Sequence, residues 1–202
     1  MTIVYILTNE IMPEVIKIGI TKNLEERIKS LDNTSTPLPF ECYYAVETNN
    51  AKEVEKLLHE TFEDKRIRKN REFFRCLPEQ AKSALLIVEK LGGTDVTPTK
   101  YIVENKEDIK ALKIAKGKPI NYFEILGINK GDELTFKNDD SYKCVVIDDK
   151  NVSYKDEVLT LSQSASMILK ELGYSWKAVR GASYWCLEGE TLLSLYNQHE
   201  QA

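Results

Sequence analysis

Two short apolar stretches near the N-terminus, Val4-Tyr5-Ile6-Leu7 and Lys17-Ile18-Gly19-Ile20-Thr21, decide how the first part of the chain folds. Short runs rich in Val, Ile and Tyr that are bounded by turn-forming residues are typical of β-strands. Asn9, Glu10 and Pro13 lie between the two stretches. Residues 3–8 and 15–20 are therefore predicted to form a β-hairpin with a long loop. The first strand carries a phenol and the second an ammonium group.

Helical signals follow the hairpin and alternate with one further strand. Asn23 is a good N-cap, Glu26 follows it at capping-box spacing, and this helix is expected to end by Asn33. Residues 41–48 are predicted as a third strand and residues 51–62 as a second helix. A third helix is predicted from Pro78 to Leu91, where Gly92-Gly93 ends it. These elements predict an α+β domain over residues 1–92.

The remaining residues are predicted to form a linker and a second domain. Residues 93–118 are polar and rich in lysine, and we expect a partly helical linker. A small α+β domain is predicted for residues 119–202, near the lower size limit for independent folding. It is expected to contain strands at 133–137, 142–148 and 151–155, with Asp139-Asp140 as a turn. Ser162 is expected to cap a helix, and a last helix is expected around residues 189–197.

The composition argues against several classes of protein. No apolar stretch in the 202 residues approaches the ~20 residues of a membrane-spanning helix, and no secretory signal is visible. We therefore expect a cytoplasmic protein that has no membrane partner. The four cysteines form no Cys-x-x-Cys pair and only two histidines are present, which argues against a structural zinc site.

The net charge of −4 does not by itself predict a nucleic-acid-binding protein, but local patches decide that property. One basic cluster lies just before Glu72, and we expect it to bind nucleic acid. Its members are Lys65, Arg66, Arg68, Lys69 and Arg71. In the second domain, Trp176 and Trp185 are candidates for stacking on bases. The alternatives are a solvated face for the basic cluster and a place in a small core for the tryptophans.

Several pieces of the first 90 residues together resemble a GIY-YIG nuclease domain, and they follow one another in the order of that family. The two half-motifs are Val4-Tyr5-Ile6 and Lys17-Ile18-Gly19, similar to the subfamily typified by a phage open reading frame in which the second half-motif reads Lys-Ile-Gly. The other pieces are Asn23-Leu24, Arg27, Glu55 and His59 within EKLLHETF, and Arg71-Glu72-Phe73-Phe74. The resemblance implies a three-stranded antiparallel sheet flanked by helices and a divalent-metal-dependent endonuclease.

Two positions depart from the family pattern. The first half-motif lacks its glycine, because Ile3-Val4 precede Tyr5, and Lys17 replaces the second tyrosine. Some nucleases of the family resemble this chain in carrying lysine there. One alternative to an active endonuclease is therefore a catalytically weak or inactive nucleic-acid-binding protein on the same scaffold. A protein-interaction module is a third alternative.

The resemblance implies a catalytic set of Tyr5, Lys17, Arg27, His59 and Glu72, and the chemistry of these groups suits phosphodiester hydrolysis. Glu72 is the candidate ligand of Mg²⁺ (or Mn²⁺), an ion that takes few carboxylates and keeps most of its waters. Tyr5 is the candidate base, and its ordinary pKa of ~10 requires a nearby cation such as Lys17 or the metal. Arg27 can grip a phosphate, and His59 can transfer a proton or hold a phosphate.

Each of these groups also has a structural alternative. Glu72 can pair with a neighbouring arginine on the surface, and Tyr5 can be a cross-strand packing residue. Lys17 can protect an edge strand from aggregation. Arg27 can cover the core with its stem, while His59 can simply hold a hydrogen bond.

Residues 119–202 resemble, more loosely, the RAMA (restriction enzyme and adenine methylase associated) domains. The matching pieces are Gly131-Asp132-Glu133-Leu134-Thr135-Phe136, Leu161-Ser162, Trp176 and Ser183-Tyr184-Trp185. This resemblance implies an accessory domain that binds or targets nucleic acid. The expected partner of the chain is nucleic acid, DNA in the first place, and we expect a homodimer if both strands of a duplex are cut.

Overall fold

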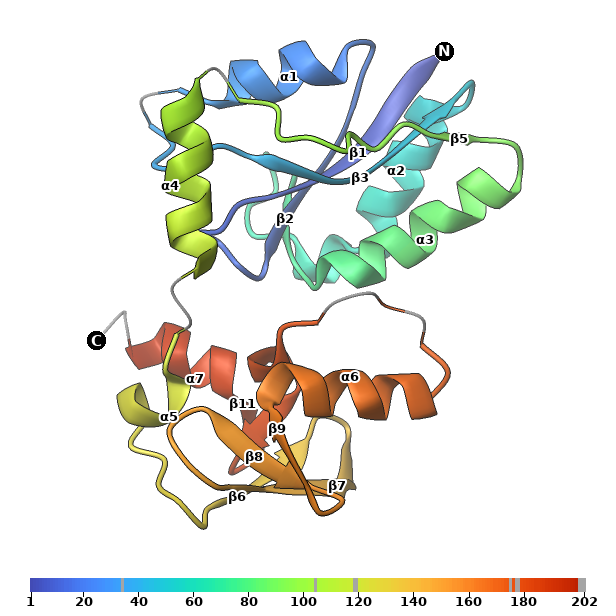
Figure 1. The fold of residues 1–202 in the computed structure, drawn as a ribbon. Helices are drawn as coiled ribbons and strands as arrows, with labels where there is room; N and C mark the ends of the chain where they lie inside the picture. The colour runs from blue at the N-terminus through green and yellow to red at the C-terminus, as the bar shows by residue number, and fades with distance from the viewer. Residues whose placement is uncertain (34, 104, 118–119, 175, 177–178, 200–202) are drawn as a thin grey trace. The chain divides into compact units, whose positions relative to one another are not determined.

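The computed structural model describes residues 1–33, 35–103, 105–117, 120–174, 176 and 179–199. The chain divides into two compact units, Met1–Lys118 and Pro119–Ala202. Each unit contains its own antiparallel sheet with helices (Figure 1), which confirms the predicted α+β class. Among the helices of the described residues, none is long and apolar enough to cross a membrane.

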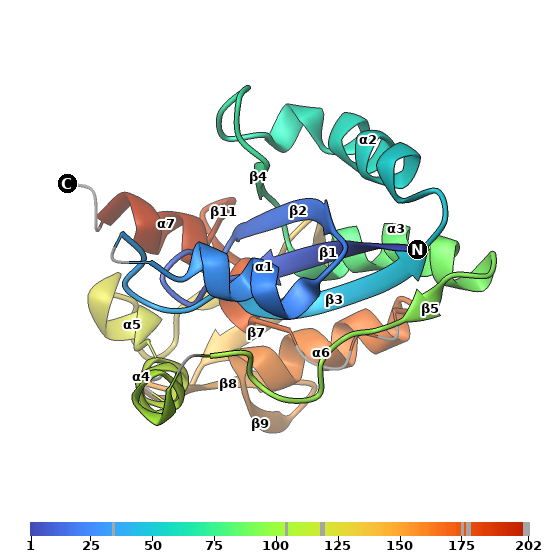
Figure 2. The same cartoon turned by 90° about the horizontal axis from the view of Figure 1, so that it is seen from above.

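The first unit is built on a five-stranded antiparallel sheet with the order β4-β2-β1-β3-β5. The three long strands are β1 (Thr2–Thr8), β2 (Val15–Thr21) and β3 (Glu41–Thr48), and they run side by side in Figure 2. They agree with the three predicted strands. Two short strands that the sequence did not predict, β4 (Phe73–Arg75) and β5 (Thr94–Asp95), add one edge strand on each side.

Helices cover both faces of this sheet. They are α1 (Leu24–Leu31), α2 (Ala51–Thr61), the short 3₁₀ helix η1 (Glu63–Lys65), α3 (Pro78–Lys90) and α4 (Lys106–Gly117). Alternation along β1 sends Tyr5 and Leu7 into a core with Ile28 of α1. The intervening residue Ile6 faces a second core that contains Leu85 of α3. Tyr5, the candidate base, therefore lies on the face that α1 covers.

The segment that the sequence suggests as a linker carries ordered elements of the first unit. β5 pairs with β3 through Thr94 and Asp95, and Val96 and Ile102 pack against the core under α1. Lys116 of α4 lies 2.7 Å from the carboxylate of Glu41 on β3. The described residues of 94–103 and 105–117 therefore complete the first unit, because apolar side chains and hydrogen bonds attach them to its sheet.

The second unit has a six-stranded antiparallel sheet with the order β11-β10-β6-β7-β8-β9. Its strands are β6 (Glu133–Phe136), β7 (Asp139–Val146), β8 (Asn151–Tyr154), β9 (Glu157–Thr160), β10 (Trp185–Leu187) and β11 (Glu190–Thr191). Its helices are α5 (Tyr122–Ile125), α6 (Leu161–Glu171), the 3₁₀ helix η2 (Gly181–Ser183) and α7 (Leu192–His199). The sheet is therefore larger than the three strands that the sequence predicts.

Two local predictions in the second unit were wrong by about two residues. The turn before β7 centres on Asn138, which has a positive φ of 67°, and not on Asp139-Asp140. Thr160, not Ser162, caps α6, and Gln163 completes a reciprocal capping box with it. Ser162 instead accepts a hydrogen bond from the backbone N–H of Gly181 at 3.1 Å. Its hydroxyl is thus used in a contact between segments that are distant in sequence.

Candidate functional site

The hydroxyl of Tyr5 lies over a glycine on the neighbouring strand. Tyr5 of β1 is paired directly with Gly19 of β2. A Cβ atom at Gly19 would stand 2.6 Å from the Tyr5 hydroxyl oxygen and 2.8 Å from Cζ. The ring of Tyr5 therefore occupies the space that any other residue at position 19 would need. This contact explains why a glycine is required in the middle of an apolar strand.

We predict that Gly19→Ala displaces the Tyr5 ring and lowers the free energy of unfolding of the first unit by about 1–3 kcal/mol, the usual cost of overpacking. Urea denaturation of the variant gives the value. The double variant Gly19→Ala, Tyr5→Phe is the control, because loss of the hydroxyl removes the nearest clash and should recover part of the cost. Full additivity of the two changes would contradict this account of Gly19.

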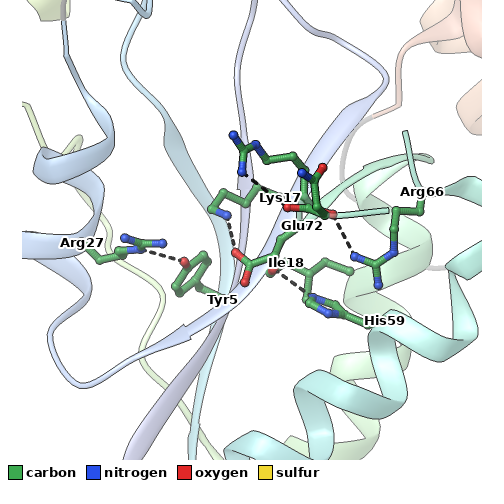
Figure 3. Close-up of polar contacts among 9 residues, drawn as sticks. Tyr5, Lys17, Ile18, Arg27, His59, Arg66 and Glu72 are labelled. Atoms are coloured by element: carbon green, nitrogen blue, oxygen red, sulfur yellow. Dashed lines mark hydrogen bonds and ion pairs between the residues drawn. The ribbon is translucent and has the colours of Figure 1, made fainter. Parts of the chain in front are cut away.

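Arg27 holds the hydroxyl of Tyr5 from the side of α1. Asn23 caps this helix as predicted, with its side chain accepting the N–H of Glu26. Ile28 is buried on the helix, which leaves the neighbouring Arg27 half-buried at the border of the core. The Arg27 Nε–H donates to the Tyr5 oxygen over 3.1 Å, as the close-up shows (Figure 3). This hydrogen bond raises the pKa of Arg27, so the guanidinium remains charged.

The environment of Tyr5 has opposing effects on its ionisation. The side chain has 0% exposure, and burial raises the pKa of Tyr5 above its ordinary value. The hydrogen bond and the charge of Arg27 lower that pKa, but they do not outweigh the effect of burial. Arg27 is therefore the cation that favours the phenolate here, a role that the sequence suggested for Lys17.

Lys17 is directed at Glu72. Its Nζ lies 2.5 Å from Oε2 of Glu72, and the same ammonium lies 5.1 Å from the centre of the Phe73 ring. Glu72 stands one residue before β4, and its backbone carbonyl accepts the N–H of Ile18 of β2 over 3.2 Å. Pairing between β2 and β4 thus brings together two charges that are 55 positions apart in the sequence.

His59 and Glu55 of α2 are hydrogen-bond partners for backbone groups of β2 that β4 does not reach. β4 pairs only with residues 15–17 of β2, so the next backbone groups need other partners. The Nε2 of His59 lies 3.1 Å from the carbonyl oxygen of Ile18, and this nitrogen carries the proton because a carbonyl only accepts. The N–H of Ile20 donates to Glu55. His59 thus holds a hydrogen bond, which is its structural alternative. Its other ring nitrogen, Nδ1, is the one left to transfer a proton or to contact a phosphate.

The two carboxylates of this region have opposite pKa shifts. Burial raises the pKa of Glu55 above its ordinary value. The charges of His59 and Lys17 lower this pKa, but their effect is smaller than that of burial. Burial also disfavours ionised Glu72, but the hydrogen bond and charge of Lys17, with His59 and Arg27, lower its pKa below the ordinary value. Glu55 is absent from the predicted catalytic set, although its spacing of four residues from His59 could have indicated it. Groups with perturbed pKa values that gather in one place are typical of functional sites.

Glu72 is the carboxylate that the sequence predicts as the ligand of a divalent ion, and the described part of the structure shows no metal site there. The Glu72 side chain is 42% exposed, so solvent reaches it, and Lys17 contacts its Oε2. No group of three or more His, Cys, Asp or Glu residues within the described ranges is placed to hold a metal. Mg²⁺ keeps several waters and needs only one or two carboxylates. A lone carboxylate such as Glu72 would be compatible with Mg²⁺, and the metal itself stays a prediction.

The basic cluster before Glu72 divides into two kinds of residue. The Arg66 guanidinium is tied down by Glu63 at 2.6 Å and by the carbonyl of Arg71 at 2.8 Å, and it lies 4.6 Å from the centre of the Phe74 ring. Its side chain is only 12% exposed. In this conformation the Arg66 guanidinium is engaged within the first unit, and its nucleic-acid contact stays a prediction. Lys65 is half-buried near the Phe62 ring, whereas Arg68, Lys69 and Arg71 are exposed.

The two tryptophans of the second unit also differ. Trp185 has 0% exposure, and its ring packs edge-on against Phe136. Its Nε1–H donates to the carbonyl of Leu161 and to the hydroxyl of Ser164 at 3.2 and 3.0 Å. Trp185 is thus a core residue, and the prediction that it stacks on bases is wrong. Trp176 is half-exposed and stays a candidate; its ring lies 4.6 Å from that of Tyr174.

Comparison with known families identifies part of the first unit. Residues 2–89 match the family model of the T5orf172 domain, a GIY-YIG-like and nuclease-related family. The matched range spans Tyr5, Lys17, Arg27, His59 and Glu72, whose roles stay predictions, and it agrees with the family resemblance drawn from the sequence. The second unit has no assigned family. No curated protein and no solved structure matches the chain.

Proposed function

We propose that the T5orf172 domain of residues 2–89 is a divalent-metal-dependent endonuclease that hydrolyses phosphodiester bonds, in DNA in the first place. The observation that supports this best is the pair of contacts that gathers the four key groups. Arg27 binds Tyr5 at 3.1 Å and Lys17 binds Glu72 at 2.5 Å, from four separate segments of the chain. Arg27 and Glu72 also interact electrostatically, so the two pairs belong to one cluster.

The four groups divide the work of hydrolysis. Tyr5 is the proposed base: its phenol first loses a proton to solvent, and Arg27 stabilises the phenolate that results. The phenolate oxygen then takes a proton from the attacking water as the water oxygen bonds to phosphorus, which returns Tyr5 to the neutral phenol. The bond from phosphorus to the leaving oxygen then breaks, and that oxygen takes a proton from solvent. A divalent ion at Glu72 would neutralise charge on the phosphate. Because Tyr5 is fully buried in the free protein, substrate binding has to open a path to its hydroxyl.

Exposed lysine and arginine side chains next to Glu72 are the proposed contacts for the nucleic-acid backbone. Arg68, Lys69 and Arg71 are exposed in the loop that ends at Glu72. Lysine and arginine that reach phosphates supply most of the sequence-independent affinity for nucleic acid, and this affinity falls steeply with salt. We propose these three residues, with a lesser part for Lys65, as the binding surface of the first unit.

A cleavage assay with Mg²⁺ or Mn²⁺ tests the proposed activity on plasmid DNA and on DNA and RNA oligonucleotides. We expect the wild type to cut in the presence of metal and to stop on addition of EDTA. Glu72→Ala should reduce cutting to background, while the matched control Glu53→Ala, an exposed carboxylate of α2, should cut like the wild type. The proposal fails if the wild type cuts no better than Glu72→Ala.

A second candidate function, a nucleic-acid-binding protein without catalysis, is favoured by two observations. Lys17 already forms an ion pair with the carboxylate of Glu72, and the side chain of Tyr5 has no access to solvent in this conformation. On this account the protein binds DNA with a steep salt dependence but does not cut it, and Glu72→Ala has no effect on binding. Measurement of affinity beside the cleavage assay separates the two functions.

For the second unit we propose an accessory role in binding or targeting nucleic acid, based on the resemblance of residues 119–202 to RAMA domains. Trp176 is its proposed contact, because it is partly exposed, unlike Trp185. We further propose a homodimer for cleavage of both strands of a duplex. Trp176→Ala should weaken DNA binding by the full chain, and an unchanged affinity would remove this residue from the surface.

A further inference from the structure

The ion pair between Lys17 and Glu72 joins a buried charge to a half-exposed one. The Lys17 side chain is 6% exposed, whereas that of Glu72 is 42% exposed. Lys17 stands opposite Leu7 and Phe73 on the neighbouring strands. Within the described residues, Glu72 is the only carboxylate that forms a salt bridge with Lys17. The buried ammonium therefore makes its direct ion pair with Glu72, while Glu55 interacts with it electrostatically without a salt bridge.

A divalent ion at Glu72 would compete with Lys17 for the same single negative charge. A buried charge that loses its partner is strongly destabilising, because the interior does not solvate it as water does. Arg27 contributes another positive charge nearby, as its effect on the pKa of Glu72 indicates. The metal-loaded site would therefore carry excess positive charge until an anion enters. The diester phosphate of a nucleic acid is an anion that can pair with Lys17.

We propose that Lys17 couples the binding of metal to the binding of nucleic acid by exchanging its partner from Glu72 to a substrate phosphate. Each ligand alone then binds weakly. A metal ion alone would take Glu72 away from Lys17 and leave the ammonium without its ion pair, and a phosphate alone would have to displace Glu72 from Lys17. Together they satisfy both charges. Linkage requires the effect to be reciprocal, so metal tightens nucleic-acid binding by the same factor as nucleic acid tightens metal binding. This inference rests on the proposed metal ligand and substrate class.

Two binding measurements test the coupling without any turnover. The affinity for a fluorescent DNA oligonucleotide is measured in EDTA and in Ca²⁺ at equal ionic strength, which detects tightening by the ion. Mn²⁺ binding to the protein without DNA is measured by electron paramagnetic resonance. For the wild type we expect Ca²⁺ to tighten DNA binding by about tenfold or more, within the usual range of coupling between sites.

The variants of Lys17 decide the origin of the coupling. For Lys17→Met we expect Mn²⁺ to bind the free protein more tightly than the wild type does, and Ca²⁺ to change DNA affinity by less than about twofold, since no coupling remains. Lys17→Arg keeps the charge and should keep the coupling. Lys22→Met, the matched control, removes an exposed charge at the end of β2 and should leave the coupling unchanged.

Three results would overturn the inference: equal coupling in Lys17→Met and the wild type, no coupling in the wild type, or unchanged Mn²⁺ affinity in Lys17→Met. If Lys17→Met does not fold, as judged by circular dichroism, loss of coupling in Lys17→Arg also overturns it, and its retention supports it. Metal-dependent DNA cleavage without coupling in the wild type would reject the inference and leave the proposed function intact. Absence of both cleavage and DNA binding would reject both.

Discussion

Tyr5→Phe is expected to lower the rate of phosphodiester cleavage by about 10²–10⁴-fold, the usual contribution of a general base. Phenylalanine keeps the ring that packs against α1 in the buried core and loses only the hydroxyl that Arg27 holds. Single-turnover cleavage with Mg²⁺ measures the chemical step directly. Because the change removes little apolar surface, the variant should fold like the wild type, which circular dichroism and thermal unfolding verify.

A matched variant separates the role of Tyr5 from a general effect of removing a phenol. Tyr101 belongs to the same unit but is 40% exposed, so Tyr101→Phe should cleave like the wild type. If Tyr5→Phe cleaves at a rate within about twofold of that of Tyr101→Phe, the role of Tyr5 as general base is refuted, since a general base contributes far more to the rate. Tyr5 would then be a packing residue, as its full burial allows.

Trp185→Ala is expected to lower the free energy of unfolding of the second unit by about 3–5 kcal/mol, the usual cost of removing a large core ring. The variant loses the ring contact with Phe136 and the two hydrogen bonds of Nε1. The Ser164 hydroxyl keeps its bond to the carbonyl of Thr160 at 3.1 Å, so the loss is mainly of packing. Chemical denaturation followed by circular dichroism measures it.

Trp176→Ala is the control for this prediction, because the same ring is removed from a half-exposed position. Its effect on stability should stay below about 1 kcal/mol, as for most substitutions near the surface. A similar loss of stability in both variants would show that Trp185 is not the special core residue proposed here. Similar stability in Trp185→Ala and the wild type would contradict its place in the core.

Local patterns in the sequence predicted most elements of the first unit. The strands at 2–8, 15–21 and 41–48 follow from short apolar runs between turn residues, and the α1 N-cap follows from one side chain, Asn23. Such signals act over a few residues, so they can be read without the fold. β4, β5, β9, β10 and β11 were missed because strands of two to four residues carry little pattern and depend on their neighbours in the sheet.

The sequence also proposed which side chains form the candidate site, because they match the order of a family. It did not predict how they are connected. Arg27 lies on Tyr5, and Lys17 lies on Glu72, although Lys17 was expected to act on Tyr5 or on a phosphate. Trp185, predicted to stack on bases, is fully buried, and the side chain of Arg66 is only 12% exposed. Residue type and spacing do not report the exposure of a side chain.

By itself, then, the amino-acid sequence determined the α+β class, the long strands and helices, and the identity of the polar groups that accompany them. Only the tertiary structure decided that Gly19 makes room for the Tyr5 ring and that Glu72 neutralises Lys17. The physical reason is the distance along the chain over which each kind of interaction acts. Strand and helix signals depend on neighbours in sequence, whereas steric fit and charge pairing depend on distances of a few ångströms between residues that only the sheet register brings together.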